Sequence, residues 1–181
     1  MGAVTEWIDT LEFVAESPDG TVRSRACGRE PLTVKLSPSG VEQHSEFSLA
    51  EQVAIAAREA LLAYKDAFDR RLYGDRDPVE LAEAGDDFAK RQLELHDAVA
   101  DVTGVGVSPA RYVDVEWHGV AGIRFRIQAG TIPRLRRAQL TAEINSGITA
   151  AERDRGRRII RASEQVFGPI PFPPYKGVRR E

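Results

Sequence analysis

The 181-residue sequence predicts an α+β fold of two similar units, each a small antiparallel sheet followed by a long amphipathic helix. Two observations lead to this class. Short runs in which apolar and polar residues alternate are typical of strands with one packed face and one wet face. Later in each half the apolar residues recur every three or four positions, which is the spacing of a helix packed along one side. This change of period occurs twice along the chain.

The first unit is expected to cover residues 1–76. Its strands are predicted at 11–16, 21–27 and 32–36. Pro18-Asp19-Gly20 separates the first two, because Pro fixes φ and Gly takes a positive φ at little cost. A helix follows at 48–73, with Ser48-Leu49-Ala50-Glu51 as its capping box.

The second unit is expected to cover residues 77–168. Asp77 and Pro78 suit the start of a helix over 78–102, and the stretch from Gly104 to Pro109 then reads as a loop. Alternating apolar and polar residues predict a hairpin with strands at 112–117 and 122–128. Apolar residues at helical spacing then predict a last helix at 138–167. The stretch 132–135 is short and carries a proline, so it is a poor third strand.

The repeated order of elements indicates either an internal duplication or the recurrence of a common α+β arrangement. Leu49-Ala50-Glu51-Gln52-Val53 can be laid over Leu140-Thr141-Ala142-Glu143-Ile144. Ala56-Ala57 can then be laid over Ala150-Ala151, with a spacing that slips by several residues.

Composition favours a cytoplasmic globular protein. The single cysteine, Cys27, excludes an internal disulfide framework and suits a reducing compartment. No apolar run reaches the roughly 20 residues that span a bilayer, and no signal peptide is evident, so no membrane partner is expected.

The net charge of −3 conceals an asymmetry. Residues 1–103 hold 11 Lys and Arg against 21 Asp and Glu, a balance of −10, whereas residues 104–181 hold 14 against 7, a balance of +7. The basic half can supply an anion-binding surface. Alternatively, the acidic and basic halves pack against each other, or against those of a second copy.

Eight arginines flank the two ends of the last expected helix: Arg134, Arg136, Arg137, Arg153, Arg155, Arg157, Arg158 and Arg161. Such a set can neutralise nucleic-acid phosphates and give salt-dependent binding that ignores sequence. The alternative is a solvated helix face, partly paired with Glu152, Asp154 and Glu164.

The sequence offers no recognisable catalytic constellation. His44, His96 and His118 stand alone, none has a zinc-ligand spacing, and no phosphate-binding or nucleophile motif is present. We therefore expect a protein that is not an enzyme and has no catalytic residues, no metal and no cofactor.

Residues 169–181 form a proline-rich tail, for which polyproline II or an extended arm is expected. The tail can dock in an aromatic-lined groove of a partner, or lie across its own domain. The candidate contact residues are Phe172, Pro173, Pro174 and Tyr175.

Three stretches of the first unit carry a family resemblance: Ser17-Pro18-Asp19-Gly20-Thr21-Val22, Pro31-Leu32-Thr33-Val34-Lys35-Leu36-Ser37-Pro38, and Phe47-Ser48-Leu49-Ala50-Glu51-Gln52 with its alanine-rich continuation. With these the chain resembles the YbaB/EbfC family of bacterial nucleoid-associated proteins. The resemblance implies a small α+β unit that dimerises through its sheet, and DNA binding without sequence preference.

Family members typically contain one unit, so two units in one chain are expected to mimic the family's dimer. Actinobacterial relatives also act as accessory proteins of type VII secretion. The leading hypothesis is therefore a nucleoid-associated, DNA-binding protein that uses the eight arginines. The alternative is a protein-binding adaptor or secretion accessory, with a protein partner or self-association.

Overall fold

The computed structural model describes residues 10–28, 32–74, 77–85 and 87–167, and it confirms the α+β class. The strands are β1 (Glu12–Glu16), β2 (Val22–Cys27), β3 (Thr33–Leu36), β4 (Thr103–Val107), β5 (Val113–His118) and β6 (Gly122–Ile127). The helices are the 3₁₀ turn η1 (Val41–Gln43) and the α-helices α2 (Glu46–Tyr73), α3 (Pro78–Glu83), α4 (Asp87–Ala100) and α5 (Arg137–Phe167).

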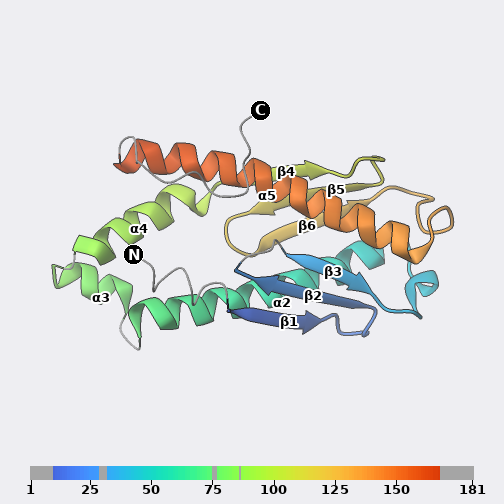
Figure 1. Cartoon of the computed structure of the whole chain (residues 1–181), viewed down its shortest axis with the longest axis horizontal. Coiled ribbons are helices and arrows are strands. Elements are labelled where there is room, and N and C mark those ends of the chain that lie inside the picture. Colours follow the sequence, from blue (N-terminus) through green and yellow to red (C-terminus); the bar gives the residue numbers. More distant parts are fainter. Residues whose placement is uncertain (1–9, 29–31, 75–76, 86, 168–181) are drawn as a thin grey trace.

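The strands form two separate antiparallel sheets, ordered β1-β2-β3 and β4-β5-β6 (Figure 1). In the first sheet Phe13 lies opposite Ala26, and Ser24 lies opposite Val34. In the second sheet Val115 lies between Gly106 and Phe125. The alternation predicted for these strands is present in their burial, since every second residue of β2 and β5 is buried.

Two expectations for the second unit were wrong. The helix predicted over 78–102 is two helices, α3 and α4, because Gly85 takes a left-handed φ of 97° between them. The predicted loop at 104–109 begins with a strand, β4. This strand pairs with β5 and completes the three-stranded second sheet. Its glycines resemble a loop signal, but they are required by the close approach of α5. A Cβ on Gly104 would lie 2.3 Å from the carbonyl oxygen of Ala151.

The start of the first long helix also differs from expectation. Ser45, not Ser48, is the N-cap of α2, and Ser48 occupies the third helical position. The Ser45 hydroxyl accepts a hydrogen bond from the Ser48 N–H (3.2 Å), and the Ser48 hydroxyl accepts one from the Ser45 N–H (3.1 Å). A serine therefore plays the part that Glu or Gln usually plays in a capping box.

The two sets of elements repeat at an interval of 91 residues, although β6 begins only 89 residues after β3. The 91-residue interval separates Glu12 from Thr103, Val22 from Val113, and Glu46 from Arg137, which are the first residues of β1 and β4, β2 and β5, and α2 and α5. The slip inferred from the sequence is therefore absent, and Ala151 corresponds to Ala60 rather than to Ala57. Both Ala60 and Ala151 are fully buried.

The turns between the first two strands of each set repeat in atomic detail. Ser17 N–H donates to the carbonyl of Val22, and Ser108 N–H donates to that of Val113. Each serine hydroxyl also accepts the N–H of the same valine, at 2.9 and 3.0 Å. At the left-handed position the first turn has Gly20 (φ 72°) and the second has Arg111 (φ 61°).

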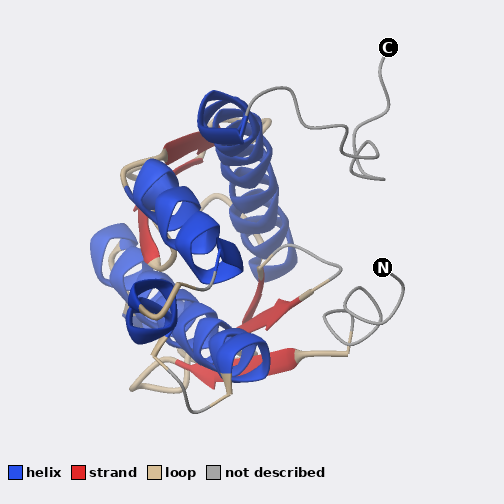
Figure 2. Cartoon of the chain, turned by 90° about the vertical axis from the view of Figure 1, so that its left-hand side faces the viewer, coloured by secondary structure: helices blue, strands red, loops and turns tan. Residues whose placement is uncertain are grey.

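The two long helices join the two sets into one core. α2 packs on β1 and β2 and also on β6, whereas α5 packs on β4 and β5 and also on β3. Buried residues of both sheets and both helices form a single apolar cluster, including Val34, Leu49, Val115 and Ile144. Viewed along the molecule, strands and long helices surround this core (Figure 2).

α3 and α4 lie at the end of the molecule opposite the β1–β2 and β4–β5 turns (Figure 1). Asp77 caps α3 by accepting the N–H of Val79 at 2.8 Å, as the sequence predicts. Among the described helices, none combines the length and the apolar character that crossing a bilayer requires.

Candidate functional site

The structure divides the eight predicted arginines into two exposed groups of three and two single residues, Arg155 and Arg158. The first group, Arg134, Arg136 and Arg137, is exposed at the start of α5. Within the described ranges these three side chains make no ion pair with a carboxylate. They also lie at the positive end of the helix dipole, which disfavours cations and favours a bound anion.

The second group lies near the other end of the same helix. Arg153, Arg157 and Arg161 are spaced by four residues and are all exposed, so they form one outward stripe along α5. Four residues rise about 6 Å along a helix. Arg157 is only weakly paired, because its ion pair with Asp154 is long (3.4 Å) and its side chain is 69% exposed.

The same carboxylate holds a neighbouring arginine more tightly. Arg158 Nε lies 3.0 Å from Asp154 Oδ2, and the same oxygen accepts the backbone N–H of Val105 on β4 at 3.1 Å. The hydrogen bond from Val105 and the charges of Arg158 and Arg157 lower the pKa of Asp154, although burial opposes them. Asp154 is therefore ionised at neutral pH, and Arg158 faces the strand rather than solvent alone.

Arg155 belongs to neither exposed group and points inward. Its guanidinium carbon lies 5.4 Å from the centre of the Trp117 ring, and its stem passes over Gly104. Burial lowers the pKa of Arg155, while the charge of Glu152 opposes that change. The Nε atom is buried and has no hydrogen-bond partner. Arg155 is thus a packing residue and is poorly placed to contact a phosphate.

About 24 Å of helix separate Arg137 from Arg153, at 1.5 Å per residue. The predicted set is therefore two exposed patches on one helix, with Arg155 and Arg158 outside both. The predicted tail residues, Phe172, Pro173, Pro174 and Tyr175, lie outside the described residues.

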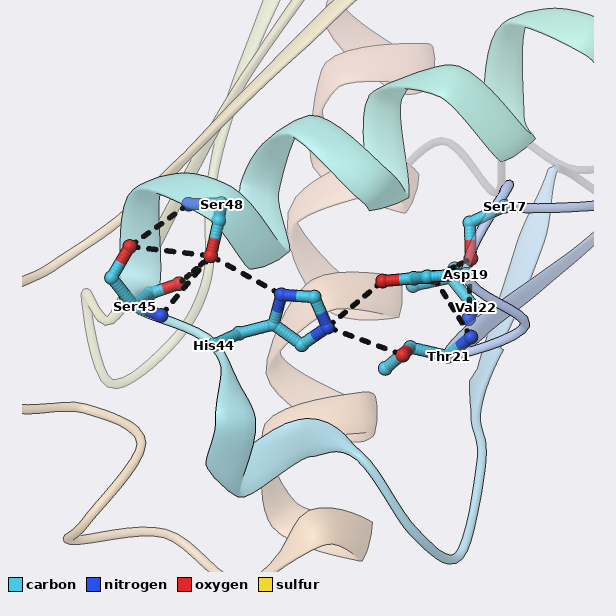
Figure 3. A network of polar contacts seen from close by, with 7 residues as sticks. All are labelled: Ser17, Asp19, Thr21, Val22, His44, Ser45 and Ser48. Carbon is cyan, nitrogen blue, oxygen red and sulfur yellow. Dashed lines mark hydrogen bonds and ion pairs between the residues drawn. The ribbon is translucent and has the colours of Figure 1, made fainter.

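A polar cluster that the sequence did not predict lies in the first unit, around His44 (Figure 3). His44 Nε2 lies 2.9 Å from Asp19 Oδ2 and 3.2 Å from Thr21 Oγ1. On its other side His44 Nδ1 lies 3.2 Å from Ser48 Oγ. The ring thus bridges the β1–β2 turn and the first turn of α2, and only 14% of its side chain is exposed.

Asp19 is the centre of this cluster. Its Oδ1 accepts the Ser17 hydroxyl at 2.7 Å and the Thr21 N–H at 2.9 Å. Burial raises the pKa of the Asp19 carboxyl, but the hydrogen bonds from Ser17 and Thr21 and the nearby His44 lower it by more. The net pKa lies below the ordinary value, so Asp19 carries its charge at neutral pH.

The order Asp19, His44, Ser48 resembles the relay that activates a nucleophilic serine. The Ser48 hydroxyl is nevertheless held in the α2 capping box, where it contacts the N–H, hydroxyl and carbonyl of Ser45. These contacts define a helix cap rather than an exposed nucleophile. In the described ranges no three His, Cys, Asp or Glu side chains gather as a metal site.

No local pattern in the sequence identifies this cluster, because its residues are far apart in the chain. Asp19 and His44 are 25 residues apart, and their proximity depends on η1 turning the chain back over the β1–β2 turn. The 91-residue repeat is the more useful signal. It places Ala110 opposite Asp19 and Leu135 opposite His44, so the cluster belongs to the first unit alone.

Searches against protein-family models, curated proteins and solved structures found no match for this chain.

Proposed function

We propose that the protein binds double-stranded nucleic acid without sequence preference, through the exposed arginines of α5. The stripe of Arg153, Arg157 and Arg161 is the observation that carries this proposal. Three arginines, placed about 6 Å apart along the helix backbone, are exposed on one side of α5. Rows of exposed arginine suit phosphate oxygens, which fix position on a duplex without reading its bases.

The patch at the start of α5 is separate from this contact, because 16 residues at about 3.6 per turn place Arg137 and Arg153 on nearly opposite sides of the helix. Arg134, Arg136 and Arg137 lie about 24 Å from the stripe along the helix. Double-stranded DNA rises about 3.4 Å per base pair, so the stripe from Arg153 to Arg161, about 12 Å long, spans roughly three to four base pairs. The resemblance of the first unit to nucleoid-associated proteins favours the same function.

The salt dependence of binding tests the proposal. Three phosphate contacts by the stripe predict that log K falls with log salt with a slope of about −3, since each neutralised phosphate contributes about −0.9. Replacing Arg153, Arg157 and Arg161 by Gln removes these three contacts and is expected to bring the slope close to zero. Fluorescence anisotropy with two duplexes of unrelated sequence measures both slopes.

A matched control carries the same change in charge elsewhere. Arg23, Arg25 and Lys35 lie on the outer face of the first sheet, where Arg25 pairs with Glu12 and Arg23 with Glu16. Replacing these three by Gln is expected to leave the slope unchanged. Equal losses in the two triple variants, or no binding at low salt, would contradict the proposal.

A further inference from the structure

A polar hollow of about 480 Å³ lies between the β1–β2 turn and the segment that joins β3 to α2. His44 and Asp19 form one wall, in the arrangement that Figure 3 shows. The remaining lining is made of glycines, hydroxyls and one amide. The lining residues are Asp19, Gly20, Thr21, Ser37, Ser39, Gly40, Gln43 and His44.

The second unit shows that the fold does not require these polar side chains. At the positions of Thr21 and His44 it has Tyr112 and Leu135, both of which pack against the apolar core. It forms the same backbone turn with Ala110 at the position of Asp19. The first unit therefore has polar side chains at three positions where its repeat has Ala110, Tyr112 and Leu135.

Several groups around the hollow retain hydrogen-bonding capacity. The side chains of Ser37, Ser39 and Gln43 make no hydrogen bond to another residue in the described part of the chain. Asp19 Oδ2 accepts from His44, and a carboxylate oxygen has more than one lone pair. The site thus offers a carboxylate, two hydroxyls and an amide oxygen as acceptors.

The residues that line the hollow restrict the chemical class of ligand that it can bind. No Lys or Arg lines the hollow, and its one basic side chain, His44, already contacts Asp19, so a phosphate or carboxylate would lack a free charged partner. Apart from the imidazole of His44, no aromatic or aliphatic side chain lines it, so an apolar ligand would gain little from burial. An ionised carboxylate beside neutral oxygen acceptors matches a primary ammonium group, which has three donors and no acceptor.

We propose that this hollow binds the primary ammonium group of a small aliphatic amine, with Asp19 as its counter-ion and the Ser37, Ser39 and Gln43 side chains as further acceptors. This site is separate from the arginines of α5 and does not depend on nucleic-acid binding.

An NMR titration of the amide resonances tests the proposal, with n-butylammonium as the probe and butan-1-ol as a neutral probe of the same size. Butylammonium is expected to shift the resonances of Gly20, Thr21, Ser39 and Gly40 in a saturable manner, and butan-1-ol is expected not to do so. Equal shifts from the two probes, or no saturable shift, would overturn the proposal.

Three variants locate the contact. Asp19→Asn keeps the shape of the side chain but removes its charge, and it is expected to weaken butylammonium at least about tenfold, as loss of a charge-assisted hydrogen bond implies. Glu16→Gln removes an equal charge from the exposed face of β1 and is expected to leave affinity unchanged. Equal affinity of Asp19→Asn and the native chain would show general attraction to an acidic surface instead.

The third variant, Thr21→Tyr with His44→Leu, introduces the residues of the second unit. These side chains are compatible with the turn there, so the variant is expected to fold and to lose saturable binding. Its circular dichroism and thermal transition serve as the check on folding. Retained binding in the folded variant would also overturn the proposal.

Discussion

The side-chain amide of Asn145 hydrogen-bonds both backbone groups of Val34, accepting the N–H at 2.8 Å and donating to the carbonyl at 2.9 Å. Val34 lies on β3, at the edge that β2 does not cover. Asn145 lies on α5, 111 residues later. One amide thus takes the place of a neighbouring strand and ties the helix of the second repeat to the sheet of the first.

α5 seals a second edge in the same way. Asp154 accepts the outward N–H of Val105 on β4, an edge strand. At the equivalent positions α2 has Ala54 and Ala63, which can make no such bond. Unpaired strand edges are sites of unwanted pairing between chains, so these two side chains of α5 protect β3 and β4 from it.

We expect Asn145→Ala to lower the free energy of unfolding by about 2 kcal/mol. The substitution leaves two backbone groups of a half-buried strand edge without protein partners. Urea unfolding followed by circular dichroism measures the change. Ser146→Ala, one residue further along α5, has no side-chain hydrogen bond to lose among the described residues and is expected to change stability by less than about 0.5 kcal/mol. Similar losses in both variants would contradict the role given to Asn145.

We expect Gly104→Ala to destabilise the protein by about 3 kcal/mol or more. The new Cβ would lie 2.3 Å from the Ala151 carbonyl oxygen and 2.5 Å from the Arg155 Cβ, so strand and helix must move apart. Gly156→Ala is the matched control, because a Cβ there meets no atom within 4 Å. That change is expected to stabilise α5 by about 1 kcal/mol. Thermal unfolding distinguishes the two, and a tolerated Gly104→Ala would contradict the tight packing.

Asp154 is expected to contribute acid sensitivity. Its pKa in the folded protein lies below its ordinary value, so the unfolded chain binds the proton more tightly. The contribution of Asp154 is therefore complete above the unfolded pKa, near 3.9, and is lost as pH falls through the lower folded pKa. Asp154→Asn should lower stability at pH 7 and flatten the loss of stability between neutral and acid pH. Urea midpoints at a series of pH values test this.

Glu152, on the same helix, is expected to have the opposite effect on the pH dependence of stability. Burial raises the pKa of Glu152, although the charges of Arg155 and Arg153 oppose it. The folded protein therefore binds this proton more tightly, and the favourable contribution is lost as pH rises through the raised folded pKa. Glu152→Gln is expected to increase stability at pH 7. Urea unfolding at pH 7 measures this change. A lower stability of Glu152→Gln would contradict the prediction, because it would show that contacts to the charged carboxylate outweigh the cost of its burial.

Local patterns were sufficient for most individual elements. The alternation around Pro18-Asp19-Gly20 placed the first hairpin within one residue, because a turn and its flanking strands are specified by adjacent residues. The long helices α2 and α5 were also visible, because their apolar residues keep helical spacing over many turns. The first helical residue was less predictable, since Ser45 and Ser48 are both suitable caps.

β4 was missed for a physical reason. Gly104 and Gly106 carry no side chain and so gave no alternation to read, and glycine by itself is a turn signal. Their function becomes visible only when α5 lies against the strand, where any larger residue would collide with Ala151 or Gly147.

The sequence alone determined the α+β class, the long helices and the division into an acidic and a basic half, because periodicity and charge are properties of neighbouring residues. Only the tertiary structure decided which arginines face solvent, that Arg155 turns inward to Trp117, and that Asp19 meets His44 beside a hollow. These relationships join residues that are distant in the chain. They depend on how α2 and α5 pack across both sheets, which no local period specifies.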